Sequence, residues 1–147
     1  KLSKTGKVVP NGVKPIPHEW DTFLFFTNLG KNVELIMPSN TPYNKNADCI
    51  IDSVIWEAKS PTTTNHRSIE RLFYSASNQS DSIIIDLRRA KGKEDAVATL
   101  EKCFKNTRKV RNMHIITRKE RLGPTKNSLA SHSQTCYNKT IEGDLLL

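Results

Sequence analysis

The sequence predicts an α/β domain with a mixed central sheet flanked by helices. Two observations indicate this fold class. Segments with helical spacing of apolar residues alternate with short β-branched runs, in the order helix, strand, strand, strand, helix, strand, helix, strand. The chain has 147 residues, enough for one domain with a buried core. Strands that are joined through helices are expected to pair in parallel, with right-handed crossovers.

The first helix and the first strand are marked by residues that favour their ends. Pro17 suits the first helical turn, where a missing N–H costs nothing, and Gly30 suits the position just past the last turn. The strand "NVELIM" follows and ends before Pro38. Residues 39–47 have the composition of a loop. Residues 1–16, with four lysines, two prolines and no acid, are expected to be a flexible basic leader.

The second half of the chain predicts two further helices, each followed by a strand. After the loop "SPTTTNHR", apolar residues recur at helical spacing from Ser68, and "SIIIDL" suits a buried strand. Residues 93–106 predict an amphipathic helix with acids early and lysines late, and "VRNMHIIT" predicts the last strand. The domain is therefore expected to span residues 17–118. Residues 119–147 lose this periodicity and are expected to form a poorly specified tail.

The net charge of the chain indicates which class of partner it binds. It is +8, with a pI of about 9.5, which favours a polyanion such as nucleic acid, without indicating any sequence specificity. No run approaches the ~20 apolar residues that a membrane span needs. We therefore expect no membrane insertion by this chain.

A β-hairpin is predicted within "NADCIIDSVIWEAKSP", residues 46–61. If Asp52 and Ser53 form a two-residue turn, Asp48 lies directly opposite Glu57. Because side chains alternate along a strand, Asp48, Glu57 and Lys59 should project from one face. The other face is expected to be core and carries Cys49, Ile51, Val54, Trp56 and Ala58.

Two carboxylates on opposite positions of a hairpin repel each other, so something should offset the repulsion. A divalent cation would do so, and magnesium prefers hard oxygen ligands. Lys59 could also neutralise part of the charge. The alternative is a solvent-exposed face on which Lys59 makes an ordinary ion pair with Glu57 or Asp48.

Glu19, on the first helix, lies at or near the face that packs on the sheet. It is either aimed at a site or complements the helix dipole as a first-turn acid.

Further candidates for substrate binding lie on the second helix and after two strands. The helix carries a polar stripe that either touches phosphate or is simply solvated: Ser68, Arg71, Ser75 and Gln79. Arg88 and Arg89 follow "SIIIDL", near a strand's carboxyl end, where open α/β sheets usually bind ligands. They either hold phosphates or play a surface role. Arg118 follows the last strand in the same way.

The spacing D-x8-E-x-K, formed by Asp48, Glu57 and Lys59, resembles the PD-(D/E)xK nuclease motif, with Ala47 in place of the usual proline. The wider text resembles the C-terminal tRNase domain of CdiA-type contact-dependent growth inhibition toxins over roughly residues 14–117. The segments that carry this resemblance are "KPIPHEWDTFLFF", "NVELIMPSNTP", "DCIIDSVIWEAKSP", "SIERLFYSASNQSDSIIIDLRR" and "VRNMHIIT".

The resemblance implies a PD-(D/E)xK nuclease-like fold and a toxin at the end of a large secreted or cell-surface-delivered protein. The toxin would enter a neighbouring bacterium and cut tRNA in its cytoplasm, and a cognate immunity protein would block it in the producing cell. The active-site acids would be Glu19, Asp48 and Glu57, with Lys59 as the catalytic lysine.

The resemblance also implies a cofactor and leaves other functions open. Asp48 and Glu57 would hold Mg²⁺ or another divalent cation, and Glu19 would be a further ligand or orient water. Attack by the neighbouring 2′-OH of RNA would need no metal. The alternatives are a DNA endonuclease that uses the same motif and a non-catalytic basic module that binds nucleic acid.

Overall fold

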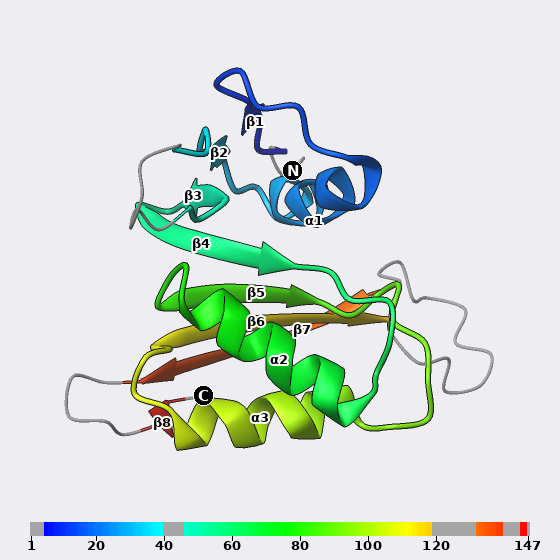
Figure 1. Cartoon of the computed structure of the whole chain (residues 1–147). Coiled ribbons are helices and arrows are strands. Elements are labelled where there is room, and N and C mark those ends of the chain that lie inside the picture. The colour runs from blue at the N-terminus through cyan, green and yellow to red at the C-terminus, as the bar shows by residue number, and fades with distance from the viewer. Residues whose placement is uncertain (1–4, 40–45, 119–131, 140–144, 147) are drawn as a thin grey trace.

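The computed structural model describes residues 5–39, 46–118, 132–139 and 145–146. Within these ranges eight strands form one mixed sheet in sequential order, and three helices pack on it (Figure 1). The helices are α1 (Pro17–Asn28), α2 (His66–Ser77) and α3 (Ala96–Asn106). The strands are β1 (Val8–Val9), β2 (Val33–Leu35), β3 (Cys49–Ile51), β4 (Val54–Lys59), β5 (Ser82–Asp86), β6 (Asn112–Arg118), β7 (His132–Lys139) and β8 (Leu145–Leu146). The predicted α/β class with a mixed sheet is confirmed.

The centre of the sheet is parallel, as the helical connections predicted. Strand β4 pairs in parallel with β5 and β5 with β6, and α2 and α3 make the two connections. These two helices lie side by side on one face of the sheet (Figure 1), where Ile83 and Ile85 join their core. Helix α1 packs with Ile84, which points to the opposite face because side chains alternate along β5. The sheet therefore has a core on each face.

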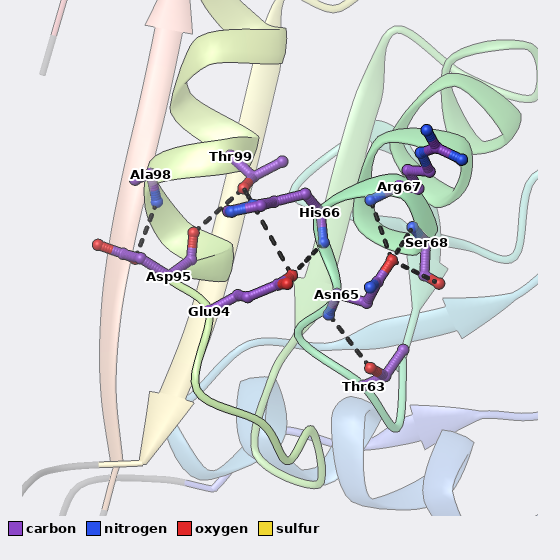
Figure 2. A network of polar contacts seen from close by, with 9 residues as sticks. All are labelled: Thr63, Asn65, His66, Arg67, Ser68, Glu94, Asp95, Ala98 and Thr99. Atoms are coloured by element: carbon purple, nitrogen blue, oxygen red, sulfur yellow. Dashed lines mark hydrogen bonds and ion pairs between the residues drawn. The ribbon is translucent and has the colours of Figure 1, made fainter.

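Helix α2 begins at His66, two residues before the predicted start, because Asn65 caps it. The Asn65 side-chain oxygen accepts from the backbone N–H groups of Arg67 and Ser68, at 3.1 and 3.2 Å (Figure 2). The His66 ring nitrogen Nδ1 lies 2.7 Å from the Thr99 hydroxyl on α3. These contacts fix the start of α2 against the start of α3.

Three strands lie in segments where the sequence predicted none. Within the expected leader, β1 pairs in parallel with β2, with Val8 opposite Val33. Within the expected tail, β7 pairs antiparallel with the whole length of β6, and β8 pairs with β7. The sequence of β7 is polar and has no apolar alternation that would predict a strand. It forms a strand because its backbone pairs with the edge of β6. The rest of the expected tail, residues 119–131, 140–144 and 147, lies outside the described residues. In the described part of the chain, no helix has the length and apolar character to cross a membrane.

Candidate active site

The hairpin that carries the three candidate residues has the predicted turn and register. Asp52 and Ser53 have φ values of 51° and 66°, so both turn residues are left-handed, as two-residue type I′ hairpins require. Cys49 lies opposite Trp56, and Ile51 lies opposite Val54. This register places Asp48 across from Glu57.

The apolar face of the hairpin packs mostly as predicted. Cys49 and Ile51 are buried in the core beneath α1, and Trp56 and Ala58 are partly buried against it. Val54 was predicted to be core, but it is 36% exposed. It lies next to the turn, at the tip of the hairpin, where strand pairing ends and the packing of the core runs out.

Strand β4 changes its pairing at the candidate site. Strand β3 pairs with β4 only as far as Trp56, whereas the register with β5 begins at Glu57. Asp48 lies where β3 departs, and its backbone N–H donates to the Trp56 carbonyl at 3.0 Å. Its carboxylate oxygen Oδ2 then accepts from the backbone N–H of Ala58 at 2.8 Å. The Asp48 side chain therefore takes the place of a partner strand at this edge of β4 and is held beside Glu57.

Glu57 is buried, although it lies on the polar face of the hairpin. Its residue exposure is 4%, and the Lys59 ammonium lies 3.1 Å from its Oε2. Its other oxygen, Oε1, is buried with no hydrogen-bond partner among the described residues. The Glu57–Lys59 ion pair is thus present but is not an ordinary solvent-exposed one. An unpartnered buried carboxylate oxygen is costly, which marks the place where a further ligand would fit.

Burial raises the pKa values of both acids. Burial is the largest cause for Glu57, followed by the charge of Asp48 and a hydrogen bond to it, and together they raise its pKa to about 8. The pKa of Asp48 is also raised, chiefly by burial, against the lowering effect of the Ala58 N–H. As a carboxylate, Glu57 finds no donor for Oε1 in the described part of the chain; when protonated, it can donate to Asp48. Near neutral pH the pair therefore holds a proton that a cation would displace.

The pair opens into a cavity of about 210 Å³ between the hairpin and α1. Lys59 lines it together with Glu19, His18, Thr22 and Ser60. Glu19 also accepts from the backbone N–H of Ile16 at 3.0 Å and so caps α1. Both roles that the sequence allowed for Glu19 are therefore compatible with its position: it closes the helix end and forms part of the wall.

Two of the three expected metal ligands are held together. In the described ranges, no group of three or more His, Cys, Asp or Glu side chains is placed to hold a metal ion. Asp48 and Glu57 form a close pair, whereas Glu19 approaches the cavity from α1. Magnesium commonly takes only one or two carboxylates and completes its shell with water and substrate phosphate. The carboxylate pair, with its unpartnered oxygen, therefore fits such a cation.

Arg88 and Arg89 line a second cavity of about 600 Å³, which shares His18 and Ser60 with the first. The two arginines are held differently. Arg88 makes a bidentate pair with the buried carboxylate of Asp86, at 2.9 and 2.7 Å. Arg89 donates from Nε to the carbonyl and the hydroxyl of Ser60, at 2.9 and 3.1 Å. The structure thus brings these two candidates beside the acidic cavity.

Three residues of the predicted polar stripe lie on α2, whereas Gln79 lies past its end at Ser77, and none of the four lines either cavity. The Ser68 hydroxyl lies 3.4 Å from the capping oxygen of Asn65, and Gln79 accepts from the backbone N–H of Asn46 at 2.8 Å. Arg71 and Ser75 are exposed to solvent. The structure therefore does not bring these four residues to the acidic pair.

Sequence reasoning missed two residues that connect the cavities, His18 and Ser60, and gave no role to Asp86. Ser60 directly follows Lys59 at a strand's carboxyl end, the same signal that pointed to Arg88 and Arg89. His18 had no such signal, since only the packing of α1 brings it to the ends of the strands.

Comparisons with known proteins agree with this architecture. The family model of the contact-dependent growth inhibition CdiA C-terminal domain matches residues 45–122, just over half of the chain. A solved structure with a similar fold is the CdiA-CT/CdiI toxin and immunity complex from Burkholderia pseudomallei. That match has 17% identity and a TM-score of 0.51, and it covers 75% of this chain and 91% of the other. A comparison with curated proteins gave no match. The matched segment contains Asp48, Glu57 and Lys59, and the chain belongs to the family of contact-dependent growth inhibition CdiA C-terminal domains.

Proposed function

We propose that this chain is a toxin domain that cleaves tRNA by metal-dependent hydrolysis, with a PD-(D/E)xK-type active site formed by Asp48, Glu57 and Lys59. The observation that carries this proposal is the state of Glu57: it is buried, its pKa is raised to about 8, and one of its oxygens has no donor among the residues that the structure describes. Proteins keep such a costly carboxylate mainly where it binds or reacts. The neighbouring Asp48 and Lys59 supply the other groups of the motif.

The proposed chemistry divides the work among the three residues. Asp48 and Glu57 would hold Mg²⁺, which when bound polarises a phosphate and lowers the pKa of water. Lys59, already beside Glu57, offsets the negative charge that develops on the phosphate as the phosphorus–oxygen bond breaks. Glu19, which also lines the cavity, would be a further ligand of the cation or would orient water.

Family membership supports the biological setting. The CdiA C-terminal domain is named as part of a larger protein, and the similar solved structure is described as a toxin and immunity complex. We therefore propose delivery on a larger secreted or surface protein, action in the cytoplasm of a target bacterium, and inhibition by a cognate immunity protein. Because the chain carries a net charge of +8, an immunity protein that covers its active site should be acidic.

The decisive experiment incubates the purified protein with tRNA and with plasmid, with and without Mg²⁺. Glu57→Gln and Lys59→Met should abolish tRNA cleavage, whereas Glu70→Gln, a matched change at an exposed acid of α2, should not. Cut plasmid beside intact tRNA would instead identify a DNA endonuclease. Toxicity that survives both active-site changes would identify a non-catalytic binding module.

The ends of the cut RNA separate the two possible routes. Hydrolysis leaves no 2′,3′-cyclic phosphate, whereas attack by the neighbouring 2′-OH produces one and needs no metal. Sequencing RNA ends from cells that express the domain, with Glu57→Gln as control, would also identify the tRNA and the position cut.

A further inference from the structure

The second cavity, of about 600 Å³, has the size of a site for a nucleotide-sized ligand and lies at the carboxyl ends of the parallel strands. Ser60 follows β4, Arg88 and Arg89 follow β5, and Arg118 ends β6. Helix α1 forms the opposite wall. Because this cavity shares His18 and Ser60 with the acidic one, a strand whose phosphate reaches Lys59 would extend directly into it.

One wall of this cavity carries two guanidinium groups with unused donors. Arg88 is occupied by Asp86 and also donates to the Asp21 carbonyl at 2.8 Å, so it stiffens the wall. Arg89 uses only its Nε, on Ser60, which fixes the side chain and leaves both terminal nitrogens without a partner among the described residues. The Arg118 side chain likewise makes no hydrogen bond or ion pair with the described part of the chain, and the residue is exposed. Arg89 and Arg118 are therefore available to a phosphate.

The other wall, formed by α1, carries an aromatic ring and an aliphatic side chain among polar groups that include the acid Asp21. Phe25 lines the cavity with Leu24 and His18, and the Arg88 guanidinium lies 5.3 Å from the Phe25 ring centroid. Asn28 adds an amide that can donate and accept hydrogen bonds. Bases of single-stranded nucleic acids are held in this way, by stacking on aromatic rings and by hydrogen bonds to their edges. The two walls thus match the two halves of a nucleotide.

We propose that this cavity binds the nucleotide next to the cleaved phosphate, with its phosphate on Arg89 and Arg118 and its base against Phe25 and His18. This inference rests on the proposed nuclease function and narrows its substrate to an unpaired segment of the nucleic acid. A base that is stacked and paired inside a duplex cannot enter a cavity between α1 and the strand ends. The cleavage site therefore lies in a single-stranded stretch.

Binding without cleavage tests the proposal. The probe is a fluorescein-labelled single-stranded RNA of about six nucleotides, titrated in Mg²⁺-free buffer against Glu57→Gln protein and followed by anisotropy. Adding Arg89→Gln or Arg118→Gln should weaken binding about tenfold and reduce the salt slope by about 1. The matched control, Arg108→Gln, removes an exposed arginine that lines neither cavity and should change binding about twofold at most.

An abasic scan tests the base pocket without altering the protein. Replacing one nucleotide of the probe by an abasic residue should weaken binding about fivefold or more at one position, and Phe25→Leu should remove that dependence. A duplex of the same sequence should bind more weakly than the single strand. Equal binding by the three arginine variants, a flat abasic scan, or equal affinity for the duplex would each overturn the proposal.

The two proposals fail separately. Binding is measured in a cleavage-deficient protein, so absence of tRNA cleavage by the unaltered protein would leave the evidence for the cavity standing. If the protein is an active nuclease but Arg89→Gln and Arg118→Gln bind and cut the single strand as well as Arg108→Gln does, only the proposal of a nucleotide-binding cavity is overturned.

Discussion

The Lys59 ammonium lies 3.1 Å from the Glu57 carboxylate, two residues earlier on the same strand, yet the two side chains differ in exposure. Glu57 retains 6% of its side-chain exposure and Lys59 retains 31%. Lys59 therefore faces the cavity, and its positive charge partly compensates the negative charge of the more deeply buried Glu57 carboxylate. The arrangement places a positive charge beside Oε2 of Glu57, while no described residue bonds its other oxygen, Oε1.

Glu57→Gln should separate activity from stability. The amide is isosteric and neutral, like the protonated Glu57 that the raised pKa favours near neutral pH, so the thermal midpoint should be unchanged or higher. tRNA cleavage should fall by at least about a hundredfold, because a group that stabilises the transition state is lost. Single-turnover cleavage and thermal melting measure the two effects. Substantial cleavage by this variant would remove Glu57 from the active site.

The stability of the metal-free protein should depend on pH through Glu57. Its pKa is about 8 in the folded protein, against an ordinary value of 4.5, so between these values the folded state holds a proton that the unfolded chain has lost. The contribution is fully present below pH 4.5 and is lost as pH rises toward 8. Urea unfolding across this range should give a decline that is steeper in the unaltered protein than in Glu57→Gln. Parallel curves would contradict the raised pKa.

Mg²⁺ should stabilise the protein by binding the ionised pair. Since the cation competes with the proton held by Asp48 and Glu57, the rise in thermal midpoint should be larger at pH 8 than at pH 6. Asp48→Asn should reduce this rise, whereas Glu70→Asn, at an exposed position of α2, should retain it. A midpoint that is indifferent to millimolar Mg²⁺ at pH 8 would indicate that the pair does not hold the ion without substrate.

Glu19 should show its two roles through two substitutions. Glu19→Gln keeps an oxygen to accept from the Ile16 N–H, so stability should be retained while cleavage falls. Glu19→Ala removes the cap as well and should also lower the free energy of unfolding by about 1 kcal/mol. Full activity in Glu19→Gln would leave Glu19 with the capping role alone.

Arg88 and Arg89 should differ sharply in their effect on stability. Burial by itself would raise the pKa of Asp86, but hydrogen bonds from Arg88 and Thr22 outweigh it and hold that pKa below its ordinary value. Arg88→Leu would leave a buried carboxylate unpaired and should lower the free energy of unfolding by about 3 kcal/mol. Arg89→Leu, at the exposed neighbouring residue, should cost less than about 1 kcal/mol. Denaturant unfolding compares the two, and equal losses would contradict this division.

Much of the site could be predicted because a hairpin is a local structure. A two-residue turn fixes the register, and alternation then fixes which side chains share a face. The sequence therefore determined that Asp48 lies opposite Glu57, with Lys59 on the same side. It also determined the parallel order of β4, β5 and β6, since helices connect these strands.

Only the tertiary structure decided how those groups are held. Glu57 is buried where β4 begins to pair with β5. Arg88 is bound to Asp86, whereas the terminal nitrogens of Arg89 have no partner among the described residues. The tertiary structure also recruited β1 and β7, whose own sequences predicted no strand, through the edges of β2 and β6. The physical reason is the same in each case: burial, ion pairing and strand addition depend on neighbours that are distant in the chain, and a local pattern carries no record of them.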